Sequence, residues 1–272
     1  MLPKNKILVT GGAGFIGSHI VDLLVHQKER VLVVDNFSTG KKSNINPDYL
    51  KGANPNVRLL KKNISCLTKR DLSGVGIIIH LAFLPLVQHS LKYPEETEQN
   101  NVGGTIHLLE LSRKIAPKKF IFASSCVIYQ ITNPYAVQKL ACEEYCKLYE
   151  KLYGTPMAIL RYLNVYGPRQ DASSSYSGVI ARFMELKKEG KPFEIFGDGK
   201  QQRDFIAVQE IAKRTVKAVA LKGIYDVGTG KPMNINQVAD WIGGKDWPRR
   251  HLPARKGEMR AIWAGKYGTR TL

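Results

Sequence analysis

The sequence predicts an α/β fold with a doubly wound parallel sheet, followed by a smaller mixed α/β lobe. Three observations support this prediction. Short apolar runs alternate with longer helical patterns through about the first 165 residues, a glycine-rich turn follows the first apolar run, and the alternation ends after about Tyr166. Alternating strands and helices form βαβ units, which place parallel strands in one sheet covered by helices on both faces.

The expected elements of the first part alternate regularly. Short runs rich in β-branched residues are expected to form strands at residues 6–10, 30–35, 57–61, 76–81, 119–124 and 156–162. Longer helical patterns lie between them, at residues 14–27, about 94–116 and 135–153. Sheets of this kind bind ligands beyond the carboxyl ends of their strands, so residues that follow the strands are the first candidates for a functional site.

The pattern changes after about Tyr166 to loops, short helices and isolated strands. Helices are expected there at residues 178–190, 208–221 and 236–242. We therefore expect one domain over residues 1–165, joined by parts of 203–228, and a smaller lobe over 166–272.

Composition excludes several classes of protein. Hydrophobic residues make up 43% of the chain and charged residues 24%, which excludes disorder, collagen and a disulfide-stapled miniprotein. The longest apolar run, residues 77–87, is interrupted by His80 and Pro85 and is too short to span a bilayer. The N-terminal residues lead into glycines, which is typical of a first strand and not of a signal peptide. No membrane association is expected.

The charge of the chain is unusual, because 41 Lys and Arg against 23 Asp and Glu give a formal net charge of +18. The basic residues are scattered and no zinc-finger or RNA-binding motif accompanies them, so a basic solvated surface is favoured and no nucleic acid partner is expected. The four cysteines, Cys66, Cys126, Cys142 and Cys146, have no framework spacing and no companions for a metal site. Reduced thiols in a cytoplasmic protein without a metal are the simplest interpretation.

A glycine-rich turn follows the first expected strand and precedes the first expected helix. Gly12, Gly14 and Gly17 form a G-x-G-x-x-G pattern, and Gly11, Gly14 and Gly17 form an overlapping one. Glycines at this spacing permit a tight turn, let the backbone approach a pyrophosphate and bring the helix close to the strand. The amides at the helix start then face the anion, helped by the helix dipole. The turn predicts a dinucleotide site.

A carboxylate follows the second expected strand. Asp35 lies 18 residues beyond Gly17, where it can accept hydrogen bonds from both hydroxyls of an adenosine ribose and would repel a 2′-phosphate. NAD is therefore favoured over NADP, although Lys41 and Lys42 lie close enough in sequence to attract a phosphate.

A tyrosine and a lysine lie one helical turn apart. Asn133 and Pro134 predict a helix start, which places Tyr135 and Lys139 on one face. A phenol is a poor base at neutral pH, but a nearby ammonium, a nicotinamide cation and a helix N-terminus would each favour the phenolate. Tyr135 is therefore a candidate general acid and base. Ser125, at the end of the preceding strand, is a candidate for the same proton network.

Together these motifs resemble the extended short-chain dehydrogenase/reductase family, whose nucleotide domain is a Rossmann fold, and within it the nucleotide-sugar epimerases of the UDP-galactose (UDP-glucose) 4-epimerase type. Matching segments are TGGAGFIGSH at 10–19, DNFSTG at 35–40, HLA at 80–82, NVGGT at 101–105, SSCVIY at 124–129, YAVQK at 135–139, LRYLNVYGPRQ at 160–170 and GDGKQQRDF at 197–205. The later segments are the more diagnostic ones. The resemblance implies an enzyme with tightly bound NAD, a UDP-sugar substrate and a homodimeric assembly.

The resemblance also implies roles for single residues. The implied catalytic residues are Ser125, Tyr135 and Lys139. The residues implied to bind NAD are Gly11, Gly14, Phe15, Ile16, Gly17, Asp35, Asn36, Ser38, Gly40, Asn63, Ile64, Leu81, Ala82, Asn101, Tyr135, Lys139 and Leu163. The residues implied to bind the UDP-sugar are Asn164, Val179, Ile195, Phe196, Arg203, Arg255 and Glu258. The two arginines can fork onto a diphosphate. Ile195 and Phe196 are explained equally well as core residues.

Two features differ from the pattern of the family. Only residues 130–134 separate Tyr129 from Tyr135, where relatives carry a longer loop. The sequence also stops at Leu272, where relatives continue into a further helix. We expect a more open sugar site, which would hold a keto intermediate less firmly, and a lobe shortened at its C-terminus.

The residues after Ser125 favour one reaction of the family. Dehydratases carry an Asp-Glu pair there and decarboxylases a Glu, whereas this chain has Cys126 and Val127, which are not acids at neutral pH. Reversible C4 epimerisation of a UDP-hexose through a 4-keto sugar is the expected activity. The alternatives are another nucleotide-sugar epimerase or a reductase on the same scaffold, a non-catalytic NAD-binding protein, and a nucleic-acid binder, the last motivated only by the charge.

Overall fold

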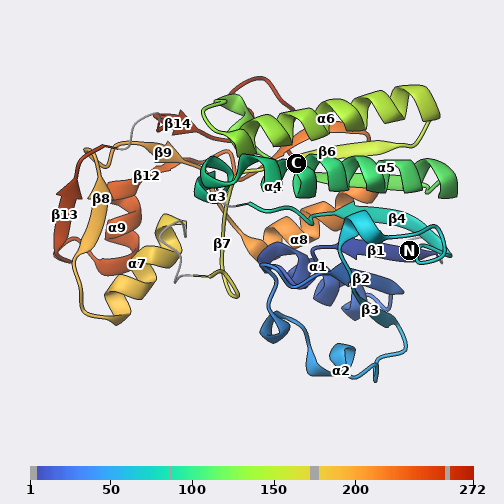
Figure 1. Ribbon diagram of the computed structural model, residues 1–272. Helices are drawn as coiled ribbons and strands as arrows, with labels where there is room; N and C mark the ends of the chain where they lie inside the picture. Colours follow the sequence, from blue (N-terminus) through green and yellow to red (C-terminus); the bar gives the residue numbers. More distant parts are fainter. Residues whose placement is uncertain (1–4, 86, 172–177, 255–257) are drawn as a thin grey trace. The chain divides into compact units, whose positions relative to one another are not determined.

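The computed structural model describes residues 5–85, 87–171, 178–254 and 258–272 (Figure 1). The chain forms two compact units, each built from two segments. The first unit comprises Met1–Arg161 and Ala212–Tyr225, and the second comprises Tyr162–Ile211 and Asp226–Leu272. The assignment of cofactor binding to the first unit and of substrate binding to the second stays a prediction.

The centre of the fold is a seven-stranded sheet. Its strands are β1 (Lys6–Thr10), β2 (Val31–Asp35), β3 (Val57–Lys61), β4 (Val75–His80), β5 (Lys119–Ser125), β6 (Met157–Tyr162) and β11 (Gly223–Val227). Their order is β11-β6-β5-β4-β1-β2-β3, and the pairs β1–β2, β1–β4, β2–β3 and β4–β5 are parallel. All residues of β2 and β4 are buried, as is typical of strands covered on both faces. The order reverses between β1 and β4, where doubly wound sheets bind ligands. The expected fold class is confirmed.

Helices cover this sheet, and two short ones, over residues 47–50 and 87–92, were not expected from the sequence. They are α1 (Phe15–His26), α2 (Pro47–Leu50), α3 (Val87–Lys92), α4 (Pro94–Glu98), α5 (Gly104–Ile115), α6 (Pro134–Tyr153) and α8 (Val208–Lys217). In Figure 1, α5 and α6 lie side by side on one face of the sheet, and α1 lies on the other. Each expected strand and the helix over residues 135–153 are confirmed to within a residue or two of their ends.

The helix expected over residues 94–116 is interrupted. α4 ends at Glu98, a π-helical turn spans Gln99–Gly103, and α5 begins at Gly104. Asn101 in this turn is fully buried, and its Oδ1 accepts a hydrogen bond from the Leu84 amide at 2.7 Å. Its Nδ2 donates to Gln138 Oε1 at 2.8 Å. A π turn re-aims a side chain within a helix, and here it directs an amide into this buried network.

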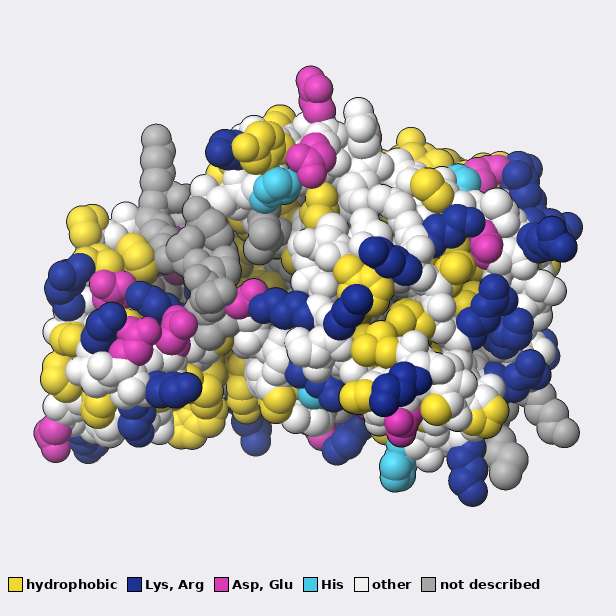
Figure 2. Space-filling view, turned by 60° about the horizontal axis from the view of Figure 1, so that its bottom comes forward, with side chains coloured by type: hydrophobic (Ala, Val, Ile, Leu, Met, Phe, Trp, Pro, Cys, Tyr) yellow, Lys and Arg dark blue, Asp and Glu magenta, His cyan; other side chains and the backbone are white. Residues whose placement is uncertain are grey.

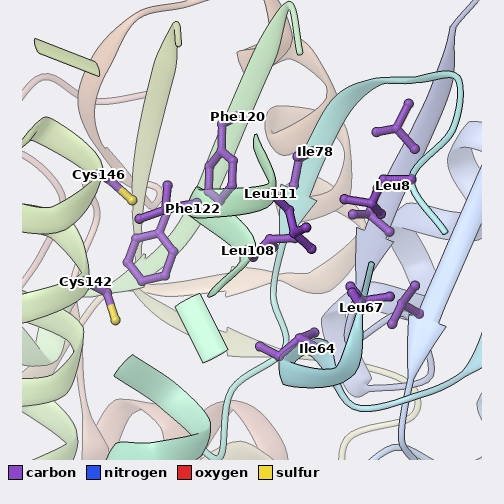
Figure 3. Packing of buried hydrophobic residues seen from close by; sticks show 14 of the residues in the cluster. Leu8, Ile64, Leu67, Ile78, Leu108, Leu111, Phe120, Phe122, Cys142 and Cys146 are labelled. Carbon is purple, nitrogen blue, oxygen red and sulfur yellow. The ribbon is translucent and has the colours of Figure 1, made fainter. Parts of the chain in front are cut away.

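The core of the first unit lies between the sheet and the pair of helices α5 and α6 (Figure 3). Strand residues such as Leu8, Ile78 and Phe120 pack against helical residues that include Cys142 and Cys146. Burial raises the pKa of Cys142 to about 11, so this thiol is a neutral packing group. All four cysteines are free thiols, and the described residues contain no cluster of His, Cys, Asp and Glu arranged to hold a metal.

The second unit has its own core between two helices and a strand pair. α7 (Val179–Lys188) and α9 (Ile235–Gly243) pack with β8 (Phe193–Phe196), which pairs in parallel with β13 (Arg249–Leu252). The rings of Phe183 and Phe193 stack there with centroids 4.4 Å apart.

Shorter strands complete the second unit. β7 (Asn164–Tyr166) pairs with β10 (Phe205–Ala207), and β9 (Gln202–Arg203) lies between β12 (Met233–Asn234) and β14 (Ala261–Ile262). None of the helices in the described part of the chain is long and apolar enough to cross a membrane.

Candidate active site

The glycine turn between β1 and α1 has no room for side chains. Gly11 has a φ of +71°, and a Cβ there would lie 2.8 Å from a backbone nitrogen of the loop after β4. A Cβ on Gly17 would lie 2.1 Å from the Gly11 carbonyl oxygen, so the helix could not approach the strand. Gly14 is the N-cap of α1 and offers no side-chain cap, which leaves the amides of Phe15 and Ile16 suited to an anion such as a pyrophosphate.

Asp35 ends β2, and backbone surrounds its carboxylate. The residue is 7% exposed, and its side chain accepts hydrogen bonds from the amides of Ala13 at 2.9 Å and Phe37 at 2.8 Å. A Cβ on Gly40 would lie 2.8 Å from one carboxylate oxygen. Burial raises the pKa of Asp35, and the two amides oppose this effect. The close-fitting glycines, the uncapped amides and this carboxylate together fit a dinucleotide with free ribose hydroxyls.

Local turns hold two further residues implied to bind the cofactor. Asn36 Oδ1 accepts hydrogen bonds from the amide and hydroxyl of Ser38, at 3.0 and 2.8 Å. Asn63 Oδ1 accepts in the same way from the amide and hydroxyl of Ser65, both at 3.0 Å. Asn63 thus caps the short turn that begins at Ile64, which is itself buried in the core. Asn serves this capping role as well as Asp does.

A buried chain of hydrogen bonds connects β1, β4 and α5. His80 Nδ1 lies 2.7 Å from Thr10 Oγ1, and His80 Nε2 lies 3.0 Å from Thr105 Oγ1. Thr105 donates its hydroxyl hydrogen to the Asn101 carbonyl oxygen at 2.6 Å, so His80 Nε2 must carry the ring hydrogen and Nδ1 must accept from Thr10. Burial lowers the pKa of His80 to about 3, which keeps the ring neutral.

This chain fixes the loop that approaches the glycine turn. Thr10 Oγ1 accepts hydrogen bonds from the amides of Leu81 and Ala82, both at 3.2 Å. The sequence predicted that Leu81 and Ala82 border the cofactor, but it did not reveal the roles of Thr10, His80 and Thr105. Their signal was weak: two polar residues at the ends of apolar strands and a third inside a helix.

The start of α6 is held from two sides. Asn133 Oδ1 accepts a hydrogen bond from the Ala136 amide at 3.0 Å, as the sequence predicted for a cap. The Tyr135 amide donates to the hydroxyl of the buried Ser90 on α3 at 3.2 Å. Two of the orphan amides of the first turn are therefore satisfied, and the backbone that carries Tyr135 is anchored.

The structure brings together the three implied catalytic residues. The Tyr135 hydroxyl is hydrogen-bonded to the hydroxyl of Ser125, which ends β5. Lys139 is buried one turn along α6, with its Nζ 5.9 Å from the centre of the Tyr135 ring. This Nζ donates to the Ala123 carbonyl oxygen at 2.6 Å. Segments from β5 and α6 thus place a hydroxyl, a phenol and an ammonium side by side.

Burial dominates the electrostatics of this group. Burial raises the pKa of Tyr135, and the hydrogen bond with Ser125 opposes this only in part. Burial also lowers the pKa of Lys139 to about 7. Burial acts against the expectation that Lys139, a nicotinamide cation and the helix start each favour the phenolate, and that combined expectation stays a prediction. The protein's own groups hold Tyr135 as a neutral phenol, and a nicotinamide cation would supply the further positive charge.

A buried ion pair beside this group was not anticipated from the sequence. Glu143 on α6 is fully buried and accepts hydrogen bonds from Arg161 Nε at 3.0 Å and Nη2 at 2.7 Å. Glu143 Oε1 also accepts from the Ser124 hydroxyl at 2.5 Å, and Arg161 Nη1 donates to the Tyr129 hydroxyl oxygen at 3.1 Å. The pair therefore ties α6 and β6 to both ends of the turn that follows Ser125.

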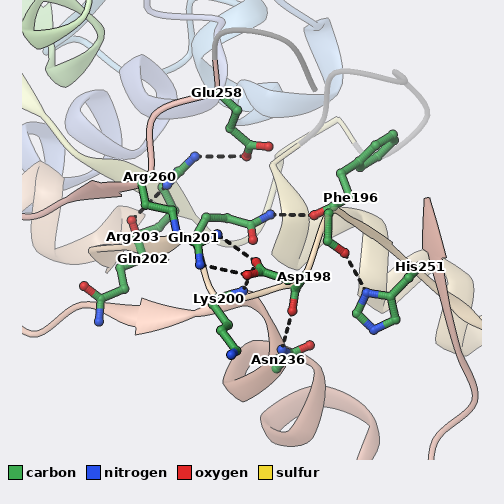
Figure 4. A network of polar contacts seen from close by, with 11 residues as sticks. Phe196, Asp198, Lys200, Gln201, Gln202, Arg203, Asn236, His251, Glu258 and Arg260 are labelled. Atoms are coloured by element: carbon green, nitrogen blue, oxygen red, sulfur yellow. Dashed lines mark hydrogen bonds and ion pairs between the residues drawn. The ribbon is translucent and has the colours of Figure 1, made fainter. Parts of the chain in front are cut away.

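In the second unit, Arg203 and Glu258 form an ion pair (Figure 4). Nη2 of Arg203 lies 3.0 Å from Glu258 Oε1, and the two side chains are 14% and 29% exposed. The neighbouring Asp204 is buried and instead accepts hydrogen bonds from the amides of Gly230 at 2.8 Å and Ala264 at 3.1 Å. The structure thus brings together two of the residues implied to bind the UDP-sugar.

The other implied substrate residues are spread over the second unit. Val179 begins α7, and Asn164 begins β7 with its side-chain nitrogen 3.2 Å from the Asp204 carbonyl oxygen. Leu163, implied to border NAD, is 4% exposed. Arg255 lies outside the described residues.

Ile195 and Phe196 on β8 differ in their surroundings. Ile195 is fully buried in the core of the second unit, as its interpretation as a core residue expects, and the implied substrate contact stays a prediction. Phe196 at the end of the same strand is partly exposed, and its carbonyl oxygen accepts a hydrogen bond from Gln201 at 2.9 Å (Figure 4). The two residues are adjacent on one strand, and adjacent side chains of a strand point to opposite faces of the sheet, which explains the difference.

The family model of the NAD dependent epimerase/dehydratase family matches residues 7–228. This chain belongs to that family. The putative UDP-glucose 4-epimerase of Methanocaldococcus jannaschii is 41% identical over 252 residues, which cover 87% of this chain and 81% of the relative.

Two solved structures are similar over nearly the whole chain. One is the UDP-N-acetylglucosamine 4-epimerase of Methanobrevibacter ruminantium in complex with UDP-N-acetylmuramic acid, with a TM-score of 0.89, 34% identity and coverage of 96% of this chain and 89% of that one. The other is the UDP-glucose 4-epimerase of Thermus thermophilus in complex with NAD, with a TM-score of 0.82, 32% identity and coverage of 94% and 89%. The chain is thus an enzyme of the epimerase/dehydratase family with NAD as its cofactor.

Proposed function

We propose that this chain catalyses the reversible C4 epimerisation of a UDP-hexose of the UDP-glucose/UDP-galactose type, through a 4-keto sugar and with NAD as a prosthetic group. One observation carries the proposal: the hydroxyls of Ser125 and Tyr135 are hydrogen-bonded, and no carboxylate lies in the turn that follows Ser125, Cys126–Tyr129. The similarity to proteins described as UDP-sugar 4-epimerases supports the same choice.

The roles of the protein's groups follow from this arrangement. NAD, when bound, supplies a hydride acceptor and donor. The Tyr135 oxygen takes the proton of the sugar 4-hydroxyl as C4 is oxidised and returns a proton as C4 is reduced. Ser125 donates a hydrogen bond within the same network, and Lys139 holds positive charge beside it. The keto sugar turns about its diphosphate linkage between the two half-reactions, so that no net oxidation occurs.

Elimination and decarboxylation lack their acid in this turn. Cys126 is partly buried, and the Val127 amide donates to Ser125 Oγ at 3.3 Å. Neither Cys126 nor Val127 provides the carboxylate that a dehydratase or a decarboxylase of the family carries at this place. Oxidation and reduction at one carbon need only Tyr135 and the cofactor, which favours epimerisation.

Incubation with a panel of UDP- and GDP-sugars, without added NAD, tests the proposal. We expect UDP-glucose and UDP-galactose to interconvert, because the cofactor is regenerated in each cycle. Tyr135→Phe should keep the fold and bound NAD while turnover falls by a factor of about 10² to 10⁴. Stoichiometric consumption of cofactor would identify a reductase, and retention of NAD without turnover of any sugar would indicate a non-catalytic protein. Preference for an N-acetylated UDP-sugar would move the substrate assignment to another epimerase of the family.

A further inference from the structure

The ammonium group of Lys139 is buried, and no carboxylate among the described residues forms a salt bridge with it. The residue is 4% exposed, and its Nζ donates to the Ala123 carbonyl oxygen. Glu143, one turn along the same helix, is already bonded to Arg161. The neighbouring His80 is neutral. An ammonium removed from water in this way is costly unless another group interacts with its charge.

Three aromatic rings surround this ammonium. The centre of the Phe83 ring lies 3.5 Å from Lys139 Nζ, that of Phe122 lies 4.9 Å away, and that of Tyr135 lies 5.9 Å away. A cation over a ring face within about 6 Å of its centre is attracted by the negative face of the ring, more strongly where water is excluded. Phe83 is the closest of the three and therefore has the strongest interaction.

Phe83 also contacts the phenol. The rings of Phe83 and Tyr135 meet edge-on, with centroids 5.7 Å apart and planes at 78°. An ammonium has three N–H donors. The Ala123 oxygen takes one and the face of Phe83 lies against Nζ, so rotation of the group is restricted and the direction of its remaining donor is set. One side chain thus orients the ammonium and packs against the ring of the acid/base residue.

The backbone of Phe83 is held in place by the buried chain described above. Phe83 directly follows Leu81 and Ala82, whose amides are bonded to Thr10. The loop that approaches the glycine turn therefore also delivers an aromatic ring to Lys139. The Phe83 ring also contacts β5, because its centroid lies 6.5 Å from that of the Phe122 ring.

We propose that Phe83 is a positioning residue, whose ring face binds the Lys139 ammonium and fixes it beside Tyr135. The proposal rests on the proposed function, in which Lys139 supplies positive charge for proton transfer by Tyr135. Phe83 contacts the ammonium of Lys139 and the ring of Tyr135, so it acts on proton transfer by positioning these two groups.

Stepwise fluorination of the Phe83 ring tests this, because it weakens the negative face with little change in size. We expect kcat for UDP-glucose epimerisation to fall steadily with the number of fluorines, to about one tenth for trifluorophenylalanine, with KM changed less than about twofold. The matched control is the same series at Phe120, which is fully buried beside His80 and has no contact with the ammonium in the described structure. Phe83→Tyr should keep most of the activity, and Phe83→Leu should lose it.

A second measurement separates this contact from the activity. Urea unfolding of the NAD-free protein is compared for trifluorinated and unmodified Phe83, each with Lys139 and with Lys139→Met. We expect fluorination to raise the unfolding equilibrium constant about tenfold with Lys139 present and to have little effect in the Lys139→Met background. This cycle reports on the contact even if UDP-hexoses are not substrates.

Three outcomes overturn the proposal. Equal losses from fluorination at Phe83 and Phe120 would show general packing, and an unfolding effect that survives Lys139→Met would show that the ammonium is not the partner. Coupling in the unfolding cycle without any change in kcat would show a contact that stabilises the fold and does not position the lysine for catalysis.

Discussion

Removing the charge of Glu143 should destabilise the chain more than any surface change on the same helix. Glu143 is fully buried, while its partner Arg161 has a side chain only 13% exposed. Two bonds from Arg161 and one from the Ser124 hydroxyl converge on the carboxylate. In Glu143→Gln, an amide N–H₂ replaces one oxygen, so a donor faces the guanidinium and a buried charge loses its counter-ion.

The cost follows from this burial. Breaking a buried ion pair by altering one partner costs about 3 to 5 kcal/mol, because the remaining charge stays in a water-poor site. The neighbouring Glu144 provides a control, since it pairs with Lys147 at 2.6 Å with side chains 60% and 41% exposed. Exposed pairs of this kind contribute about 0.3 to 0.5 kcal/mol. Two adjacent Glu→Gln changes on α6 should therefore differ by roughly 3 kcal/mol or more in the free energy of unfolding.

Urea unfolding followed by circular dichroism measures this difference. A second comparison uses Glu143→Met combined with Arg161→Met, which removes both charges and should recover a large part of the loss. Turnover should also fall in Glu143→Gln, because Ser124 and Tyr129 flank the turn that follows Ser125. If Glu143→Gln and Glu144→Gln lowered the free energy of unfolding equally, the inferred role of burial would be wrong.

Four further outcomes are expected. Lys139→Met should raise the unfolding temperature near pH 7 while abolishing turnover. The pKa of Lys139 is lowered from 10.5 to about 7, so between these pH values the unfolded chain binds more protons than the native one, and native stability rises with pH. Calorimetry should find this rise in the unmodified protein and not in the variant. Asp35→Asn should narrow the preference for NAD over NADP by roughly tenfold in titration calorimetry, because an uncharged amide no longer repels a 2′-phosphate; an unchanged ratio would contradict the ribose assignment. The homodimer expected from the resemblance should use the exposed apolar side chains of α6, so Leu148→Glu with Leu152→Glu should shift the sedimentation coefficient to that of a monomer; an unchanged coefficient would contradict this interface. The short segment 130–134 should let some keto sugar escape, so reduced cofactor should accumulate in the absorbance spectrum during prolonged turnover, and a flat spectrum would count against an open site.

Sequence alone determined the parts of this protein that depend on local preference. The alternation of β-branched runs and helical patterns predicted the sheet, because a parallel sheet buries both faces of its strands and leaves continuous apolar runs. The spacing of Gly11, Gly14 and Gly17 predicted the turn, because a Cβ added at Gly11 or Gly17 would lie 2.8 or 2.1 Å from backbone atoms. Asn133 and Pro134 predicted the start of α6, and with it the shared face of Tyr135 and Lys139.

The tertiary structure decided what depends on segments far apart in the chain. Glu143 and Arg161, like Phe83 and Lys139, meet only after β4, β5, β6 and α6 are assembled, and neither pair leaves a periodic signal in the sequence. Burial also raises the pKa of Tyr135, since the cost of removing water from a charge is set by the packed surroundings and not by neighbours along the helix. Local sequence therefore specified which groups the site contains, and packing specified their charge and orientation.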